Sequence, residues 1–336
     1  MSSRRKVIVG VCVAILVLLV VGQPTAFAAG QRATVQRVSI GTASAGGSWY
    51  PIGQGLAAIL NDALEGIEFD APSTGGAPEN IDMIRSGEME FGLNYPMVST
   101  PAFEGRMAFQ GQAWPEFRSV MTLFENVQSP VVLRRHVRTG NVVDLEGLRF
   151  NVGTPGSGTA LEWELITSVL GINLREEFLS FADGAQGLRD GTIDGASLNA
   201  AIPHATIQQL IAEGVDIAIL DFNEDQYQRL IAELDYTFFT KIPAGTYQGI
   251  DVDIPMIAQS TFLFTGANVS EDLVYRVTKA IFENEARVRQ VHGAMRRFSR
   301  ETALDGLKQP LHVGAYRYYR EIGLAIPDEL VPPEAR

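Results

Sequence analysis

The sequence predicts an α/β fold of two lobes, each a sheet flanked by helices, with a ligand cleft between the lobes. The first supporting observation is residues 38–64, where a short β-rich run, a loop of small residues and an amphipathic helix follow one another. The second is the same arrangement about 110 residues further on, at residues 148–170. Around these units, short apolar runs alternate with helical patterns, which is typical of sheets covered by helices.

Residues 38–64 begin with a predicted strand at 38–40 and a loop at 41–48. The following helix has apolar residues at helical spacing, and Ser48 is its predicted N-cap. A loop and a helix N-terminus of this kind direct unpaired N–H groups at one point, and the helix dipole favours negative charge there. We therefore predict ligand contacts from Ser44, Gly46, Gly47 and the adjacent Tyr50. The alternative is a tight turn and a core tyrosine with no ligand.

The next elements are predicted strands at 67–71 and 91–95, joined through a helix at 79–86. Strands that alternate with helices favour a parallel sheet, and ligands of such sheets bind at the carboxyl ends of the strands. Thr74 and Gly75 lie in the small-residue loop at 72–78, and Asn94 lies at the end of the later strand. These three are further candidate binding residues, although Asn94 could instead only cap a turn.

The second unit has a predicted strand at 148–152, a loop at 153–159 and a helix after it. Ser157, Gly158 and Thr159 open that helix, and Asn199 ends a strand predicted at 192–198. These four complete the candidate site. Ser157 is one residue short of a G-x-S-x-G nucleophile elbow, so an exported serine-dependent enzyme is an alternative. None of the four histidines has a spacing typical of a catalytic triad, and we expect no enzyme.

The remaining predicted elements complete two lobes. Strands are expected at 117–124, 131–134, 179–181, 215–220 and 254–264, and helices at 185–189, 202–213, 224–234 and from residue 270. The chain is expected to cross between lobes near 125–131 and 250–265. This divides it into a signal peptide at 1–28, a first lobe at 29–128 with 255–336, and a second lobe at 129–254.

The N-terminus has the pattern of a secretory signal peptide. Arg4, Arg5 and Lys6 precede an apolar run at 7–21, and Ala26-Phe27-Ala28 gives an A-x-A cleavage site. An uncleaved anchor is the alternative. Cleavage would remove Cys12, the only cysteine, and with it any disulfide, thiol nucleophile or cysteine metal site. An exported chain without disulfides indicates the bacterial periplasm.

The charge balance indicates which partners to expect. The formal net charge is −12, and removal of residues 1–28 leaves 24 basic and 39 acidic side chains, a net charge of about −15. Such a chain is a poor candidate for binding nucleic acid or anionic membranes. The sequence contains neither a phosphate-binding Gly-Lys-Ser/Thr loop nor a dinucleotide fingerprint. We expect a monomer without a cofactor or metal.

Five motifs along the mature length resemble the TAXI family, the solute receptors of TRAP transporters. They are residues 40–53 with Gly46-Gly47-Ser48-Trp49-Tyr50-Pro51, residues 152–159, residues 188–194, residues 242–247 and residues 310–315. The resemblance implies a two-lobed periplasmic binding protein fold of type II that closes on a small organic anion, a carboxylate or an amino acid. It also implies TRAP membrane subunits as partners, with a sensor kinase as the alternative.

Three positions depart from the family pattern where the pocket is expected. Asn94-Tyr95-Pro96 stands in place of Gln-Ser-Asp, and Ala160 stands in place of a common Arg. Ser197-Leu198-Asn199-Ala200-Ala201 replaces a Gly-rich aromatic stretch. Loss of the arginine removes a bidentate partner for a second carboxylate. We therefore expect a monoanion with a less charged distal end in preference to a dicarboxylate, unless an arginine from elsewhere, such as Arg134, reaches the pocket.

Overall fold

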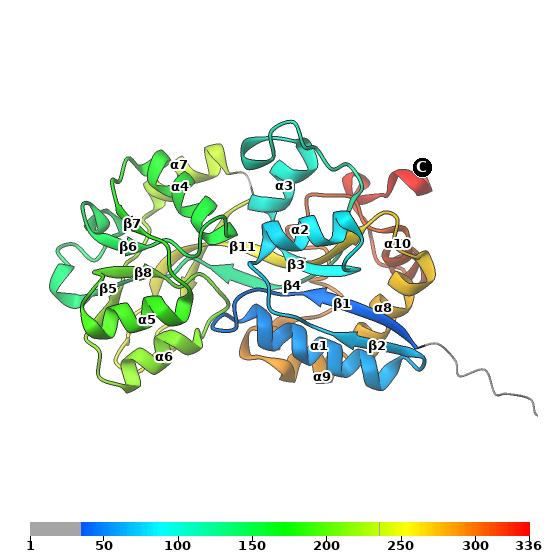
Figure 1. Ribbon diagram of the computed structural model, residues 1–336, viewed down its shortest axis with the longest axis horizontal. Coiled ribbons are helices and arrows are strands. Elements are labelled where there is room, and N and C mark those ends of the chain that lie inside the picture. Colours follow the sequence, from blue (N-terminus) through cyan, green and yellow to red (C-terminus); the bar gives the residue numbers. More distant parts are fainter. Residues whose placement is uncertain (1–34, 235) are drawn as a thin grey trace, which may run out of the picture. The chain divides into compact units, whose positions relative to one another are not determined.

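The computed structural model describes residues 35–234 and 236–336. The predicted signal peptide at 1–28 lies outside the described residues. Within the described part, the strands form two separate sheets with helices packed on them (Figure 1). This two-sheet α/β arrangement confirms the predicted fold class.

Six strands form the first sheet, in the order β10-β11-β3-β1-β2, and β4 pairs with β11. The strands are β1 Gln36–Gly41, β2 Ile67–Asp70, β3 Phe91–Asn94, β4 Phe117–Val127, β10 Phe238–Ile242 and β11 Ile254–Gly266. β1 is parallel to β2 and β3, as the strand–helix alternation predicts. β11 is antiparallel to β3, β4 and β10, so the sheet is mixed.

Five strands form the second sheet, in the order β7-β6-β8-β5-β9. They are β5 Pro130–Leu133, β6 Arg149–Asn151, β7 Arg175–Glu177, β8 Gly195–Ser197 and β9 Ile217–Ile219. β6 is parallel to β7 and β8, whereas β5 is antiparallel to β8 and β9. The carboxyl ends of β6 and β8 therefore lie at the same edge.

The helices divide between the two sheets (Figure 1). With the first sheet lie α1 Trp49–Ala63, α2 Ala77–Ser86, α3 Pro96–Glu104, α8 Glu271–Glu283, α9 Glu285–Val291 and α10 Val313–Glu321. With the second lie α4 Gly158–Leu170, α5 Phe181–Asp190, α6 Ala205–Ala212 and α7 Glu224–Glu233. α1 shows the general pattern, because Ile52, Leu56, Ile59 and Leu60 are buried at helical spacing and α1 packs against β2, α8 and α9.

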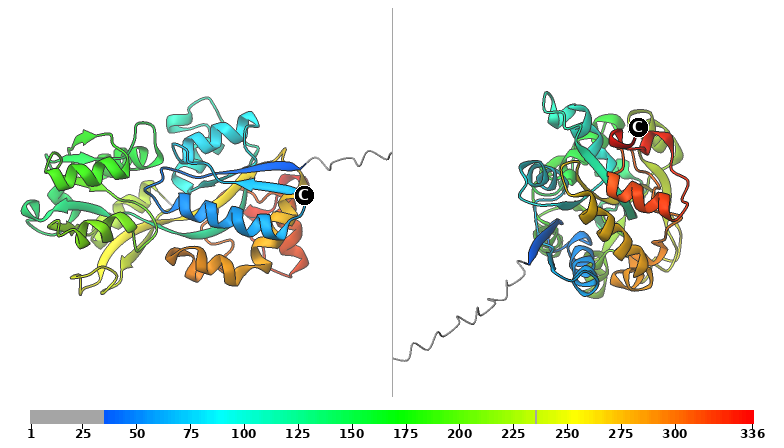
Figure 2. Two further views of the ribbon diagram at one scale, coloured as in Figure 1. Left: turned by 60° about the horizontal axis from the view of Figure 1, so that its bottom comes forward. Right: turned by 90° about the vertical axis from the view of Figure 1, so that its right-hand side faces the viewer.

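Two long strands connect the sheets. β4 leads through Gln128 and Ser129 directly into β5, and β11 pairs with β4 from Ala258 opposite Val127 to Gly266 opposite Phe117. The Gln128 N–H also donates to Ile257 O at 3.0 Å. In Figure 2 the same two groups of elements can be followed from another side, with β11 in yellow running between them. The predicted strand–strand crossing after β4 therefore consists of paired backbone.

The sequence prediction is wrong at residues 179–181. Ser180 caps α5 by accepting from Asp183 N at 3.1 Å, Phe181 begins that helix, and the strand lies earlier, at β7. The apolar pair Leu179 and Phe181 imitates a strand alternation although both side chains lie at a helix start. Two elements, α3 and β10, are absent from the prediction. α3 was not predicted because it contains Pro96 and Pro101, and prolines usually argue against a helix. The first position of a helix nevertheless accepts a proline, because no N–H is needed there.

Candidate functional site

A cleft is lined by residues from the elements of both sheets and contains about 580 Å³ of space, part of it open to solvent. The first group of elements, the first sheet with its helices, contributes Ala43, Ser44, Gly47, Ser48, Trp49, Gly75, Gly76, Ala77, Tyr95 and Asn126. The second group, the second sheet with its helices and loops, contributes Gly153, Thr154, Ser157, Gly158, Thr159, Leu179, Ser180, Phe181, Asn199 and Ala200. None of these lining residues carries a charged side chain.

Helix N-termini converge on this cleft. Its lining includes the N-cap and first residue of each of α1, α2, α4 and α5, and also Tyr95, the N-cap of α3. The first N–H groups of a helix have no partner within the helix, and each N-terminus carries partial positive charge. Several helix N-termini therefore direct N–H groups and partial positive charge at the cleft, although no Lys or Arg side chain lines it.

The first loop is held by buried hydrogen bonds. Thr42 is fully buried, and its hydroxyl donates to Pro72 O at 2.6 Å, while Gly47 N donates to Ser44 O at 3.0 Å. Ser48 occupies the predicted N-cap position but makes no side-chain capping bond. Its hydroxyl instead accepts from Ala201 N at 3.3 Å, so it joins the loop to the chain that follows β8. Ser48 is therefore the N-cap residue of α1, as predicted, but its φ of −72° and ψ of −23° are helical and its side chain does not cap the helix.

The second loop depends on a glycine conformation and on one asparagine. Gly153 has φ 104°, which side chains other than glycine rarely adopt. Its N–H donates to Asn151 Oδ1 at 3.0 Å, and Leu179 N donates to the same oxygen at 2.9 Å. Asn151 thus holds together the two loops that lead into α4 and α5.

Seven of the eleven candidate residues line the cleft. They are Ser44, Gly47, Gly75, Ser157, Gly158, Thr159 and Asn199. The other four lie behind or beside the lining, where each has its own contact. Thr74 Oγ1 lies 2.9 Å from Thr42 O and accepts from Gly76 N at 3.1 Å, and Asn94 is fully buried with Nδ2 on Ala77 O. Gly46 lies against Phe181, and Tyr50 is half-buried outside the lining.

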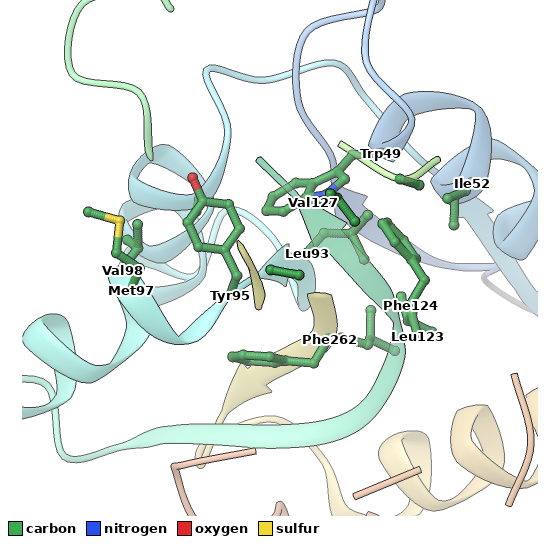
Figure 3. Packing of buried hydrophobic residues seen from close by; sticks show 14 of the residues in the cluster. Trp49, Ile52, Leu93, Tyr95, Met97, Val98, Leu123, Phe124, Val127 and Phe262 are labelled. Atoms are coloured by element: carbon green, nitrogen blue, oxygen red, sulfur yellow. The ribbon is translucent and has the colours of Figure 1, made fainter. Parts of the chain in front are cut away.

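Tyr95 and Trp49 form an aromatic wall on the first side of the cleft. Their ring centroids are 5.4 Å apart at an interplanar angle of 69°, an edge-to-face pair, and Figure 3 shows both rings side by side. Burial raises the pKa of the Tyr95 phenol well above its usual value, and the nearby Glu162 raises it further. The phenol is therefore neutral at physiological pH and acts through its hydroxyl and ring face.

Tyr95 also meets the opposite side of the cleft at Gly158. A Cβ atom on Gly158 would overlap Tyr95 Oη and would lie only 2.8 Å from Tyr95 Cζ. The absence of a side chain at the first position of α4 therefore lets a residue of the first group reach the helix N-terminus of the second.

Glu162 lies behind the cleft and is 2 % exposed. Asn199 Nδ2 donates to its Oε2 at 3.0 Å, and Gln259 Nε2 donates to its Oε1 at 2.6 Å. Burial raises the pKa of this carboxyl to about 7, although the surrounding side-chain amides oppose the rise. Glu162 was not among the predicted site residues, since a Glu in an apolar helix carries no sequence signal of its partners and Glu164, two residues on, is exposed. Phe181 and Ser180 were missed because their helix start was predicted as a strand.

Arg134, the arginine considered above, does not reach the cleft, and neither does its neighbour Arg135. Arg134 Nε pairs with Asp216 Oδ1 at 2.7 Å, and its Nη2 donates to Ile217 O at 2.7 Å. Arg135 lies 3.9 Å from Asp194 Oδ1. Neither residue lines the cleft. These two side chains therefore do not supply the arginine that a second carboxylate of a dicarboxylate would need.

Ser157 has the contacts of a helix cap. Its Oγ accepts from Ala160 N at 3.2 Å. His204, His292 and His312 each cap a helical turn through Nδ1, and His136 lies 3.4 Å from Asp194. Within 35–234 and 236–336, no histidine is hydrogen-bonded to Ser157. Nor do those ranges contain a group of three or more His, Cys, Asp or Glu residues able to hold a metal ion, or a helix with the length and apolar character of a membrane span.

Comparison with known proteins establishes the family. Residues 40–323 match the NMT1-like family. The chain belongs to this family. Among solved structures, MatC from Rhodopseudomonas palustris with bound malate has a TM-score of 0.55 at 14% identity, over 86% of this chain and 97% of that one. A protein from Bordetella bronchiseptica RB50 has a TM-score of 0.51 at 15% identity, over 89% and 86% of the two chains.

A third structure, described as a periplasmic transporter, has a TM-score of 0.51 at 12% identity, over 86% of this chain and 93% of that one. At these identities the likeness concerns the fold. This member of the NMT1-like family therefore has the two-lobed fold of periplasmic binding proteins, with its cleft between two sheets.

Proposed function

We propose that this protein is an exported solute receptor that captures a small organic anion in the cleft. The observation that carries the proposal is the convergence of four helix N-termini on a cleft without charged side chains. Backbone N–H groups and hydroxyls can hold one carboxylate there without a cation. The lining of Trp49, Tyr95, Leu179 and Phe181 favours an uncharged remainder. The preferred solute is thus a monocarboxylate.

Binding is proposed to proceed by hinge closure about residues 125–131 and 250–265. The moving parts would be the predicted lobes, residues 29–128 with 255–336 against residues 129–254, except that β10 pairs with β11 and would move with the first sheet. Direct contacts between the two sides support such a motion, among them Ser48 Oγ with Ala201 N and Thr206 Oγ1 with Gly46 O at 3.4 Å. A closing motion would form and break contacts of this kind, whereas the Gln259 Nε2 bond to Glu162 Oε1 at 2.6 Å also joins the predicted lobes.

The receptor is proposed to be periplasmic and monomeric and to deliver its solute to TRAP-type membrane subunits. The TAXI-like motifs support that partner, as do the predicted signal peptide and the fold. A sensor kinase would use the same cleft, and the genes beside this one would separate the two partners. The serine-dependent enzyme has no comparable support, since Ser157 Oγ is used as a cap.

The test is thermal unfolding of the mature protein with pyruvate, propionate, malate, glutamate and 2-oxoglutarate, followed by calorimetric titration. A monocarboxylate is expected to stabilise the protein and to bind more tightly than the dicarboxylates. Thr159→Val, which removes a lining hydroxyl, should weaken binding. Thr167→Val on the same helix should not, because Thr167 Oγ1 bonds only to backbone carbonyls of α4. A panel without any stabiliser would contradict the proposed function.

A further inference from the structure

Glu162 is a carboxyl group placed where the proposed function makes a negative charge unfavourable. It lies one turn into α4, buried behind the lining residues Thr159 and Asn199. No ion pair to Glu162 is formed by the residues that the structure describes, and its partners are side-chain amides. A buried anion without a cation beside it repels a second anion strongly, because screening by water is weak there.

The hydrogen bonds around Glu162 have a single direction. Thr159 Oγ1 donates to Asn199 Oδ1 at 2.8 Å, and Asn199 Nδ2 donates to Glu162 Oε2 at 3.0 Å. Every donor therefore points toward the carboxylate, as an ionised group requires. In this arrangement the Thr159 hydroxyl hydrogen is used on Asn199, so Thr159 has only lone pairs left for the cleft and for the Tyr95 hydroxyl, with which it also interacts. An anion in the cleft needs a hydrogen-bond donor from Thr159 in place of these lone pairs.

The hydrogen bond to the other carboxylate oxygen, Glu162 Oε1, has a fixed direction. Met97 N, which can only donate, bonds to Gln259 Oε1 at 3.1 Å, so the Gln259 amide must keep Nε2 toward Glu162 Oε1. Oε1 therefore remains an acceptor. Asn199 has no such backbone anchor, and its amide can turn over. A proton on the carboxyl thus belongs on Oε2, facing Asn199.

We propose that anion binding in the cleft is coupled to uptake of one proton by Glu162 at Oε2. The inference rests on the proposed function. Protonated Oε2 donates to Asn199 Oδ1, the turned Asn199 Nδ2 donates to Thr159 Oγ1, and the Thr159 hydroxyl hydrogen is released toward the cleft. The proton comes from solvent, and no covalent bond is made or broken. Glu162 is thereby a positioning residue that sets the polarity of a lining hydroxyl.

The groups that face the carboxyl leave it free to titrate near neutral pH. Burial raises its pKa to about 7, and an anion in the cleft would raise it further. The facing side chains are the amides of Gln128, Asn199 and Gln259, and the titratable group beside it is the Tyr95 phenol, with Tyr236 beyond. The Tyr95 phenol is neutral in this range, so protonation of Glu162 is the charge change that the solute meets.

The test is calorimetric titration of the mature protein with pyruvate at pH 8 in buffers of different ionisation enthalpy. We expect uptake of about one proton per pyruvate, and a Kd that rises about tenfold per pH unit above pH 7. Glu162→Gln imitates the protonated state, since its Nε2 can donate to Asn199 Oδ1. It should bind without proton uptake, independently of pH, and more tightly than the wild type at pH 8. Mere structural damage would weaken binding at every pH.

The matched control is Glu164→Gln, which removes an exposed carboxyl two residues along α4 and should keep the wild-type proton uptake. Pyruvate binding without proton uptake, or weaker binding by Glu162→Gln at all pH values, overturns the coupling while leaving the proposed function intact. If pyruvate does not bind, the monocarboxylate proposal fails on its own. Carbon-13 titration of Glu162 then decides, because a carboxyl that titrates below about pH 5.5 overturns the inference and one near pH 7 supports it.

Discussion

Gly158→Ala is the substitution that tests the geometry of the cleft most simply. Gly158 is the first residue of α4 and has a φ that alanine accepts, so the backbone itself imposes no penalty. The new methyl carbon would overlap Tyr95 Oη and lie 2.8 Å from Tyr95 Cζ and 3.2 Å from Val98 Cγ2. Ordinary carbon contacts are about 3.5–4.0 Å, so the Tyr95 ring must move by roughly 1 Å or the two sides of the cleft must separate.

The expected cost follows from the burial of Tyr95, which is 5 % exposed and packed against Trp49. Overpacking a site of this kind costs about 1–3 kcal/mol. We expect the free energy of unfolding in urea to fall by that amount, and the Kd for the bound monocarboxylate to rise at least about tenfold, since 1.4 kcal/mol is a factor of ten.

Two variants make the result interpretable. Tyr95→Phe removes the overlapping oxygen, so combining it with Gly158→Ala should recover part of the lost stability. Gly293→Ala is the matched control, because its methyl group would meet nothing closer than Pro203 Cδ at 3.5 Å. A Gly158→Ala protein as stable as the wild type and equal in affinity would refute the close approach of Tyr95 to α4.

Three further predictions concern single side chains. Glu162 has a pKa of about 7 in the folded protein against 4.5 ordinarily, so its stabilising contribution is complete below about pH 4.5 and is lost as pH rises to about 7. Relative to Glu162→Gln, the wild type should lose about 3 kcal/mol across that range in urea titrations, and parallel curves would contradict the burial argument. Arg134→Ala should leave anion affinity unchanged within about twofold, and a larger loss would mean that the arginine reaches the solute. Ser157→Ala should cost about 1 kcal/mol of stability through the lost cap, and turnover of any ester that this variant abolishes would restore the enzyme alternative.

Much of the fold could be predicted from local sequence patterns. The helical spacing of Ile52, Leu56, Ile59 and Leu60 locates α1, and the glycine-rich loops before α1 and α4 locate two of the helix N-termini at the cleft. These features depend on neighbouring residues, so a single sequence is sufficient. The start of α5 could not be predicted, since Leu179 and Phe181 imitate a strand and the Ser180 cap is a short-range signal with many accidental matches.

The inner part of the candidate site depends on distant contacts. Burial by tertiary packing raises the pKa of Glu162, and the hydrogen bond from Gln259, 97 residues away, opposes that rise. Thr74 and Asn94 lie at strand ends, as expected, but their polar atoms are used by Thr42 and Ala77 behind the lining. A strand end indicates the neighbourhood of a cleft, whereas the direction of a side chain is decided by its tertiary partners.

The central claim is that backbone N–H groups at helix N-termini, without a cationic side chain, hold the solute anion. A crystal structure of the mature protein with the solute retained from expression tests it most directly. We expect carboxylate oxygens about 2.7–3.2 Å from N–H groups at the starts of α1 and α4, between Trp49 and Thr159, with Tyr95 beside the solute. A solute carboxylate paired with an Arg or Lys side chain, or a solute bound outside this cleft, would contradict the claim.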